Sequence, residues 1–243
     1  MQYTCKGCNE IDYSIMSTAT ITAGGAEFID QTATLYASAF ANDPVQTYIL
    51  NALPAPRRKI YLHEYFTRLL TAAALNAAIF SSTDEGSAYA VVIPPGYQVD
   101  NPWTMLRAGI LSVLWNLGAK GCWKMLGEFE PLTLAAKTKG LKGAGVKHYY
   151  VFFVATAEEH RGKGLSSALI QQTQAKASAE GMPVWLEATT EYSARLYKRL
   201  GFEKIEKIVL GKGTADGDGL PMKGGEGVPV WGMVWWPNKP TAL

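Results

Sequence analysis

The sequence has few cysteines, only three in 243 residues. An odd number in a chain of this length argues against a disulfide framework and fits a reducing compartment. Cys5 and Cys8 have the spacing of a redox or zinc pair, but no second Cys/His pair is placed to complete a zinc site. We therefore expect no metal cofactor and no chemistry from these two thiols.

The sequence also lacks a strong charge bias and a long apolar run. Its 23 Lys and Arg nearly balance its 21 Asp and Glu, giving a net charge of +2. That excess is too small to indicate a nucleic-acid partner. The best apolar run, Ala108–Leu117, is shorter than the roughly 20 residues that span a bilayer, and the first residues are polar, unlike a secretory signal. These absences predict a cytoplasmic protein without a nucleic-acid or membrane partner, and they leave the oligomeric state open.

What the chain does have is enough length for one domain with a substantial core. Residues 1–17 show no hydrophobic period, so we expect a flexible N-terminal extension followed by a single domain over 18–243. A long helical stretch at about 102–140 is predicted as an insertion in that domain. Its three tryptophans, Trp103, Trp115 and Trp123, are expected to pack against a sheet or, alternatively, to wall a substrate cavity.

Hydrophobic spacing predicts the elements before that insertion. A short strand and a helix are expected over about 21–40, a second helix over about 57–77, and a hairpin of strands over 79–82 and 88–93. The sequence Asn42-Asp43-Pro44 should end the first helix, because the residue before proline avoids the α region. Asp43 is thus expected in a loop between helices.

The most informative stretch is Arg161-Gly-Lys-Gly-Leu-Ser166. It follows a predicted strand, Tyr149–Ala155, and precedes an amphipathic helix. Glycines let the backbone approach a ligand closely, and the unpaired amides and dipole of a helix start favour an anion. The stretch is neither a Walker loop nor a dinucleotide-binding pattern. By itself it has two interpretations, a phosphate site or an ordinary strand-to-helix connection.

The surrounding sequence resembles the GNAT superfamily of acetyl-CoA-dependent N-acetyltransferases, in particular a fungal and bacterial subgroup acting on small molecules. The similarity covers about residues 18–237. Three pieces carry it in the right order, Val154–Leu165, Leu186–Thr189 and Leu196–Phe202, and three others support it, Phe40–Pro44, Ala90–Gly96 and Val230–Val234.

The resemblance implies an α/β (α+β) fold. Its central sheet is mixed and mostly antiparallel, with helices on both faces. The fourth and fifth strands, here Tyr149–Ala155 and Val184–Ala188, should splay apart to admit the pantetheine arm of acetyl-CoA. The pyrophosphate is expected on the amides from Gly162 to Ser167. The coenzyme-binding residues that the resemblance implies are Phe153, Val154, Ala155, Arg161, Gly162, Lys163, Gly164, Leu165, Ser166, Ser167, Thr190, Ser193 and Tyr197.

The resemblance also implies that Tyr197 lies near the sulfur of the coenzyme, where its hydroxyl can protonate the departing thiolate. The general base is less apparent, because relatives often carry Glu or His where this chain has Tyr150 and Phe152. Glu187 and His148 are the remaining candidates. Asp43 is expected to bind the amine, and the predicted substrate-binding set is Asp43, Tyr150, Phe152 and Glu187.

The predicted function is therefore transfer of an acetyl group from acetyl-CoA to a primary amine of a small molecule, by direct attack on the thioester. Two alternatives stay open from the sequence. One is acetylation of a protein or peptide, as by a histone acetyltransferase. The other is a non-catalytic module that binds acyl-CoA.

Overall fold

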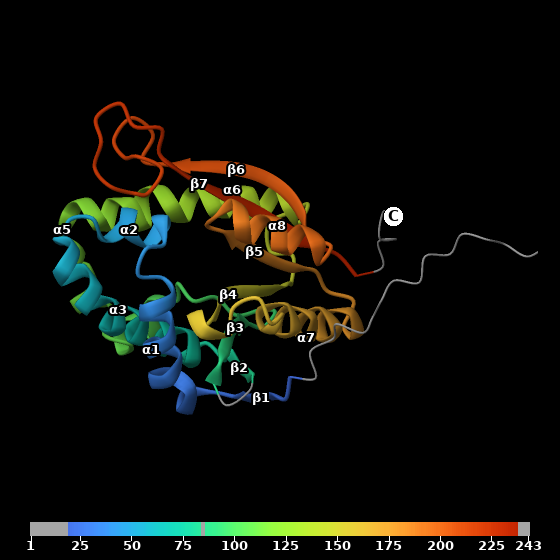
Figure 1. The fold of residues 1–243 in the computed structure, drawn as a ribbon. Helices are drawn as coiled ribbons and strands as arrows, with labels where there is room; N and C mark the ends of the chain where they lie inside the picture. The colour runs from blue at the N-terminus through green and yellow to red at the C-terminus, as the bar shows by residue number, and fades with distance from the viewer. Residues whose placement is uncertain (1–18, 84–85, 238–243) are drawn as a thin grey trace, which may run out of the picture.

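A computed structural model describes residues 19–83 and 86–237. The predicted N-terminal extension, with Cys5 and Cys8, lies outside this range. The described chain forms a sheet of seven strands in the order β1-β2-β3-β4-β5-β7-β6 (Figure 1). The strands are β1 (Ile21–Gly24), β2 (Ile79–Thr83), β3 (Ala88–Ile93), β4 (Tyr149–Thr156), β5 (Val184–Ala188), β6 (Glu203–Leu210) and β7 (Val228–Trp235).

The mixed, mostly antiparallel sheet confirms the predicted fold class. Only β4 and β5 run parallel, whereas every other neighbouring pair is antiparallel. In the described chain, β4 and β5 pair only at Tyr149–Val184 and Tyr150–Trp185, although β4 continues to Thr156. The predicted splaying of these two strands is confirmed, and it leaves one edge of β4 free beyond Tyr150.

Helices cover both faces of the sheet, and the alternation of side chains along β5 shows how. Trp185 points into a core formed with α1 (Ile29–Ala39), α2 (Pro44–Leu50) and α3 (Ala55–Leu75). Val184 and Leu186 point the other way, into a core with α7 (Leu165–Ala179) and α8 (Glu191–Arg199). Successive residues of a strand face opposite sides, so this short strand contributes to both cores.

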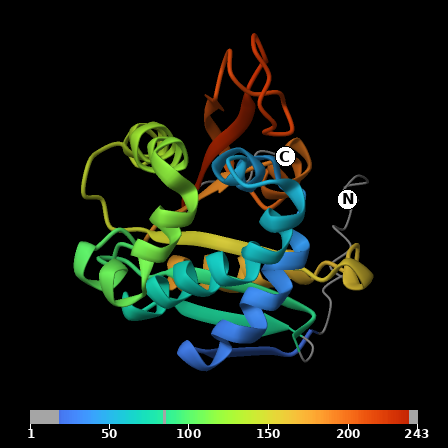
Figure 2. The same ribbon diagram turned by 90° about the vertical axis from the view of Figure 1, so that its left-hand side faces the viewer.

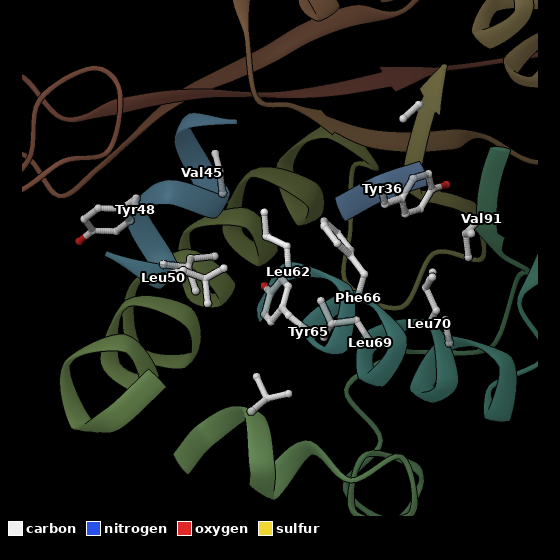
Figure 3. Packing of buried hydrophobic residues seen from close by; sticks show 14 of the residues in the cluster. Tyr36, Val45, Tyr48, Leu50, Leu62, Tyr65, Phe66, Leu69, Leu70 and Val91 are labelled. Carbon is white, nitrogen blue, oxygen red and sulfur yellow. The ribbon is translucent and has the colours of Figure 1, made fainter. Parts of the chain in front are cut away.

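The first core is rich in aromatic rings. Tyr36 of α1, Phe66 of α3 and Phe153 of β4 contact one another with ring centroids 5.3 to 5.7 Å apart. Figure 3 shows Tyr36 and Phe66 meeting between α1 and α3, with Tyr65 and Leu69 beside them. Edge-to-face pairs of this kind add to the apolar area that they bury and fix β4 against the helices.

Residues 44–50 form a helix that the sequence analysis placed in a loop. Asp43 is not simply the end of α1; it is the N-cap of α2, and Pro44 is the first helical residue. Aspartate at the N-cap and proline at the first position are both favoured at helix starts. The Asp-Pro pair therefore begins α2, whereas α1 already ends at Ala39.

The insertion consists of α4 (Pro102–Arg107), α5 (Ile110–Cys122), a π-helical segment η4 (Trp123–Phe129) and α6 (Glu130–Gly140). The expected packing of its tryptophans against the sheet is wrong. Trp103, Trp115 and Trp123 are 78%, 88% and 69% exposed. The sheet contact is made instead by α6, where Ala136 and Gly140 lie against Trp185 or its neighbour Gly232. Among the described helices, none is both long and apolar enough to cross a membrane.

Candidate active site

A cavity of about 950 Å³ opens where β4 and β5 part. Most of the predicted site residues line it. They are Asp43, Tyr150, Phe152, Phe153, Val154, Ala155, Arg161, Gly162, Gly164, Leu165, Ser166, Ser167, Glu187, Thr190, Ser193 and Tyr197. Segments more than 100 residues apart in sequence thus meet at one place. In Figure 2 the helices α1 and α3 lie toward the viewer, in front of the sheet.

One end of the cavity is the turn between β4 and α7. Gly162 and Gly164 have φ of 81° and 77°, in the left-handed region, and Gly164 is the N-cap of α7. A methyl group at either glycine would meet no protein atom within 4 Å. The space beside this backbone is open, and the Thr156 and Ser166 hydroxyls, 2.7 Å apart, tie the end of β4 to the start of α7. The geometry is that of an anion-binding helix start.

The free edge of β4 lines the cavity between this turn and the opposite end of the cavity. The register with β3 shifts between Val91 and Val92, which pair with Phe153 and Val151, so Phe152 is an extra residue in β4. A bulge of this kind bends a strand and re-aims its groups. The Tyr36 hydroxyl, buried in the core, donates to the Phe153 carbonyl at 3.1 Å and supports the bulge from below.

At the other end, Tyr197 projects from α8 into the cavity, 7% exposed. Burial raises the pKa of its hydroxyl well above the usual value, and the nearby carboxyl of Asp43 raises this pKa further. The phenol is therefore protonated at neutral pH. It is available as a proton donor inside the cavity.

Asp43 connects the start of α2 to the segment that follows β5. Its Oδ1 accepts from the amides of Val45 and Gln46, both at 3.0 Å, which caps α2. Its Oδ2 accepts from the hydroxyl of Thr189, 2.6 Å away and 146 residues later in the chain. Burial raises the pKa of Asp43, and these three hydrogen bonds oppose the rise.

Glu187 is another carboxyl group that lines the cavity, on the same side of β5 as Trp185. The indole Nε1 of Trp185 donates to Glu187 Oε1 at 2.6 Å, and the Tyr150 hydroxyl also hydrogen bonds to this carboxylate. Burial is the main cause that raises the pKa of Glu187, and the two hydrogen bonds lower it. The raised pKa moves this carboxyl toward the range that suits a general base near neutral pH.

Two predicted residues are not brought to the cavity. His148 is half-buried before β4, with its Nδ1 2.7 Å from the carbonyl of Val146, and burial lowers its pKa. Lys163 is exposed on the turn, and its Nζ lies 3.1 Å from Nδ1 of His160. Neither side chain lines the cavity.

Thr190 and Ser193 line the cavity, but their hydroxyls cap the start of α8. Thr190 Oγ1 accepts from the Ser193 amide at 3.1 Å, and Ser193 Oγ accepts from the Thr190 amide at 3.2 Å. This reciprocal pair is a capping box. It fixes the start of the helix that carries Tyr197.

Several residues that line the cavity are not predicted from the sequence. Thr189 lies in one of the segments that resemble the GNAT superfamily, but nothing in the sequence pairs it with Asp43. Met125 and Phe129 enter the cavity from η4, and Tyr65 enters it from α3. Because such residues lie on ordinary apolar helix faces, no local pattern separates them from core positions.

Comparisons with known proteins find similarity to one family. Residues 115–202 match the acetyltransferase (GNAT) family. An uncharacterized N-acetyltransferase of Schizosaccharomyces pombe is 24% identical over 185 residues, which cover 76% of this chain and 73% of that protein.

Solved structures show the same fold. One described as histone acetyltransferase HPA2 and related acetyltransferase, from Corynebacterium glutamicum, has a TM-score of 0.61 at 22% identity, covering 92% of this chain and 99% of that one. Arylalkylamine N-acetyltransferase 2 of Aedes aegypti has a TM-score of 0.58 at 17% identity, covering 91% and 100%. The family match over residues 115–202 and the similarity to the Schizosaccharomyces pombe N-acetyltransferase, together with the splayed strands and the glycine turn, support a GNAT superfamily N-acetyltransferase, which is an acyltransferase.

Proposed function

We propose that this enzyme transfers an acetyl group from acetyl-CoA to a primary amine of a small molecule. The observation that carries the proposal is the convergence of a buried phenol, Tyr197, and two carboxyl groups, Asp43 and Glu187, on one cavity. The phosphate-binding turn at the other end of that cavity fits the coenzyme.

The coenzyme is proposed to lie along the free edge of β4. Its pyrophosphate would accept hydrogen bonds from the amides between Gly162 and Ser167, where the backbone has open space beside it. The pantetheine arm would pair with backbone groups of Phe153 to Ala155, as an added strand does. This arrangement directs the thioester toward Tyr197.

The acceptor is proposed to enter from the side of Asp43 and Glu187. Two carboxyl groups in a partly apolar cavity attract an ammonium group more strongly than they would in water. Asp43 is held rigidly by three hydrogen bonds, which suits an anchor. Glu187 has a raised pKa, which suits the group that takes the proton from the ammonium.

The reaction then balances in one sequence. Glu187 takes a proton, and the neutral amine nitrogen attacks the carbonyl carbon of the thioester. The backbone N–H near Val154 stabilises the oxyanion. The C–S bond breaks as the carbonyl reforms, and Tyr197 gives its proton to the thiolate. The amine nitrogen loses its second proton to solvent, the tyrosinate regains a proton from solvent, and Glu187 releases its proton to solvent, so one proton is released overall.

The walls of the cavity favour a small acceptor over a protein. Met125 and Phe129 of η4 line the cavity, where they would narrow the space open to an extended peptide. The alternative of a histone-type acetyltransferase requires an open groove there. In this proposal the helical stretch over 102–140, and not the sheet, limits the size of the acceptor.

The test is release of free thiol from acetyl-CoA with a panel of small primary amines and, in parallel, lysine-containing peptides. We expect turnover with at least one class of small amine and little with the peptides. Peptide turnover above that of every small amine would overturn the assignment of acceptor class. Tight binding of acetyl-CoA by calorimetry with no thiol release in either arm would contradict the proposed reaction.

A further inference from the structure

The insertion carries an apolar surface that the acetyltransferase reaction does not use. We call it the tryptophan face. Its members are exposed side chains of α4, α5 and the start of η4, namely Trp103, Leu106, Leu111, Trp115 and Trp123, which are 51% to 88% exposed. On α5, Leu111 and Trp115 are one turn apart on the outer side, whereas Ile110, Val113 and Leu117 are buried on the inner side. The helix is thus apolar on both sides, and only one side is covered.

The segment that carries the tryptophan face contains cations and no acids, although the exposed Asp100 lies just before it. The sequence from Pro102 to Leu126 contains no Asp or Glu, while it includes Arg107, Lys120 and Lys124. Lys124 is held inward by the Tyr48 carbonyl and Asn51, but Lys120 is exposed. The positive charge of this segment is therefore not neutralised within it.

The start of α3 adds to this charge, and it lies beside α5. Nη2 of Arg57 is 3.4 Å from Oδ1 of Asn116, next to Trp115. Arg58 and Lys59 follow, and Ile60 is 81% exposed. In Figure 2 the insertion, in green, borders α3. The acid that faces α5 from α3 is Glu64, which lies 3.9 Å from Arg68 and 3.5 Å from Ser112.

We propose that the tryptophan face and the basic start of α3 dock onto an anionic lipid bilayer. Tryptophan is the side chain that favours the membrane–water interface, and neighbouring Arg and Lys add attraction to anionic head groups. A second copy of the chain fits less well, because the segment offers no acids to pair with the cations of its partner. This proposal departs from the expectation of no membrane partner, because overall charge and the length of apolar runs do not reveal which side chains are exposed.

Docking would place the acceptor end of the cavity near the bilayer. The residues that follow Trp123 in η4 include Met125 and Phe129, which line the cavity. The inference does not depend on the acetyl transfer, since binding to a membrane is measured without turnover.

The test is flotation of the full chain with vesicles of phosphatidylcholine, with or without about one third phosphatidylserine. We expect binding to the anionic vesicles only, weakening as salt rises. The triple variant W103S, W115S and W123S should bind at least about tenfold more weakly. The variant R57Q, K59Q and K120Q should bind the anionic vesicles about a hundredfold more weakly, and its binding should depend much less on salt.

A matched control replaces exposed apolar residues elsewhere. Leu220 and Met222 are 43% and 51% exposed in the loop between β6 and β7. The variant L220S and M222S should bind vesicles as the wild type does, and circular dichroism should show all variants folded. Equal binding to neutral vesicles, no binding to either kind, or unchanged binding of the tryptophan variant would overturn the proposal. So would a dimer in light scattering that the tryptophan variant dissociates, because a second copy would then be the occupant.

Discussion

The two ends of the cavity are built in different ways. The donor end, where the coenzyme is proposed to bind, is formed by backbone, with Gly162 and Gly164 at positive φ and open space beside them. The acceptor end is formed by buried side chains, Asp43, Glu187 and Tyr197, which hydrogen bonds and packing hold in place. A backbone site tolerates changes of side chain, whereas a side-chain site depends on each group. Substitutions at the acceptor end should therefore lower catalytic activity more than substitutions at the donor end.

The largest effect is expected for Tyr197→Phe. The phenol is buried and fully protonated at neutral pH, because burial and Asp43 raise its pKa. Without it the thiolate leaves unprotonated, so kcat should fall by about 10² to 10³. The affinity for acetyl-CoA, measured by calorimetry, should change little. An unchanged kcat would remove Tyr197 from the chemistry and weaken the contrast between the two ends.

Glu187→Gln should lower kcat by about a hundredfold. Burial raises the pKa of Glu187, so in the wild type the carboxyl becomes protonated as the pH falls through that raised value, and it can no longer accept a proton. The rate should thus decline on the acidic side in the wild type, and that decline should be absent in the variant. A pH profile of kcat checks this. An acidic limb that survives in the variant would show that another group is the base.

Asp43→Asn separates anchoring from folding. Asparagine caps a helix about as well as aspartate, so α2 should stay intact while the charge is lost. We expect the KM for the amine to rise about tenfold with a smaller change in kcat, because a hydrogen bond to a charged group contributes roughly 1.5 to 3 kcal/mol. Asp43→Ala should also lose about 1 kcal/mol of stability with the cap. If Asn and Ala variants have the same KM as the wild type, Asp43 is only a cap.

Gly164→Ala should have the smallest effect, and on the donor end alone. Alanine at a φ of 77° costs about 1 to 2 kcal/mol, and relief of that strain would move the amides of the turn. The KM for acetyl-CoA should rise about fivefold with the KM for the amine unchanged. Gly213→Ala is the matched control, since Gly213 has a φ of 81° and the same open space but lies in the loop after β6. It should lower stability similarly and leave both KM values alone.

The same difference explains what the sequence could predict. The donor turn, the splayed strands and Tyr197 lie in one continuous stretch, and the resemblance of its motifs to the GNAT superfamily predicts the splaying and the place of Tyr197. The hydrogen bond between Asp43 and Thr189 joins residues 146 positions apart, and no local pattern encodes it.

Two predictions failed for related reasons. A loop is expected after Asp43, because the residue before proline avoids the α region, but Asp43 and Pro44 together are a helix start. The tryptophans of the helical stretch are expected to pack against a sheet or to wall the cavity, and they are exposed instead. A stripe shows which side of a helix is apolar, but α5 is apolar on two sides, and spacing does not indicate which of them the core covers.

The most direct test is a structure of this enzyme with CoA bound. The account predicts the pyrophosphate on the amides of residues 162–167 and the sulfur within about 3 to 4 Å of the Tyr197 hydroxyl, facing Asp43 and Glu187. A sulfur directed away from Tyr197, or a coenzyme bound outside the gap between β4 and β5, would contradict it.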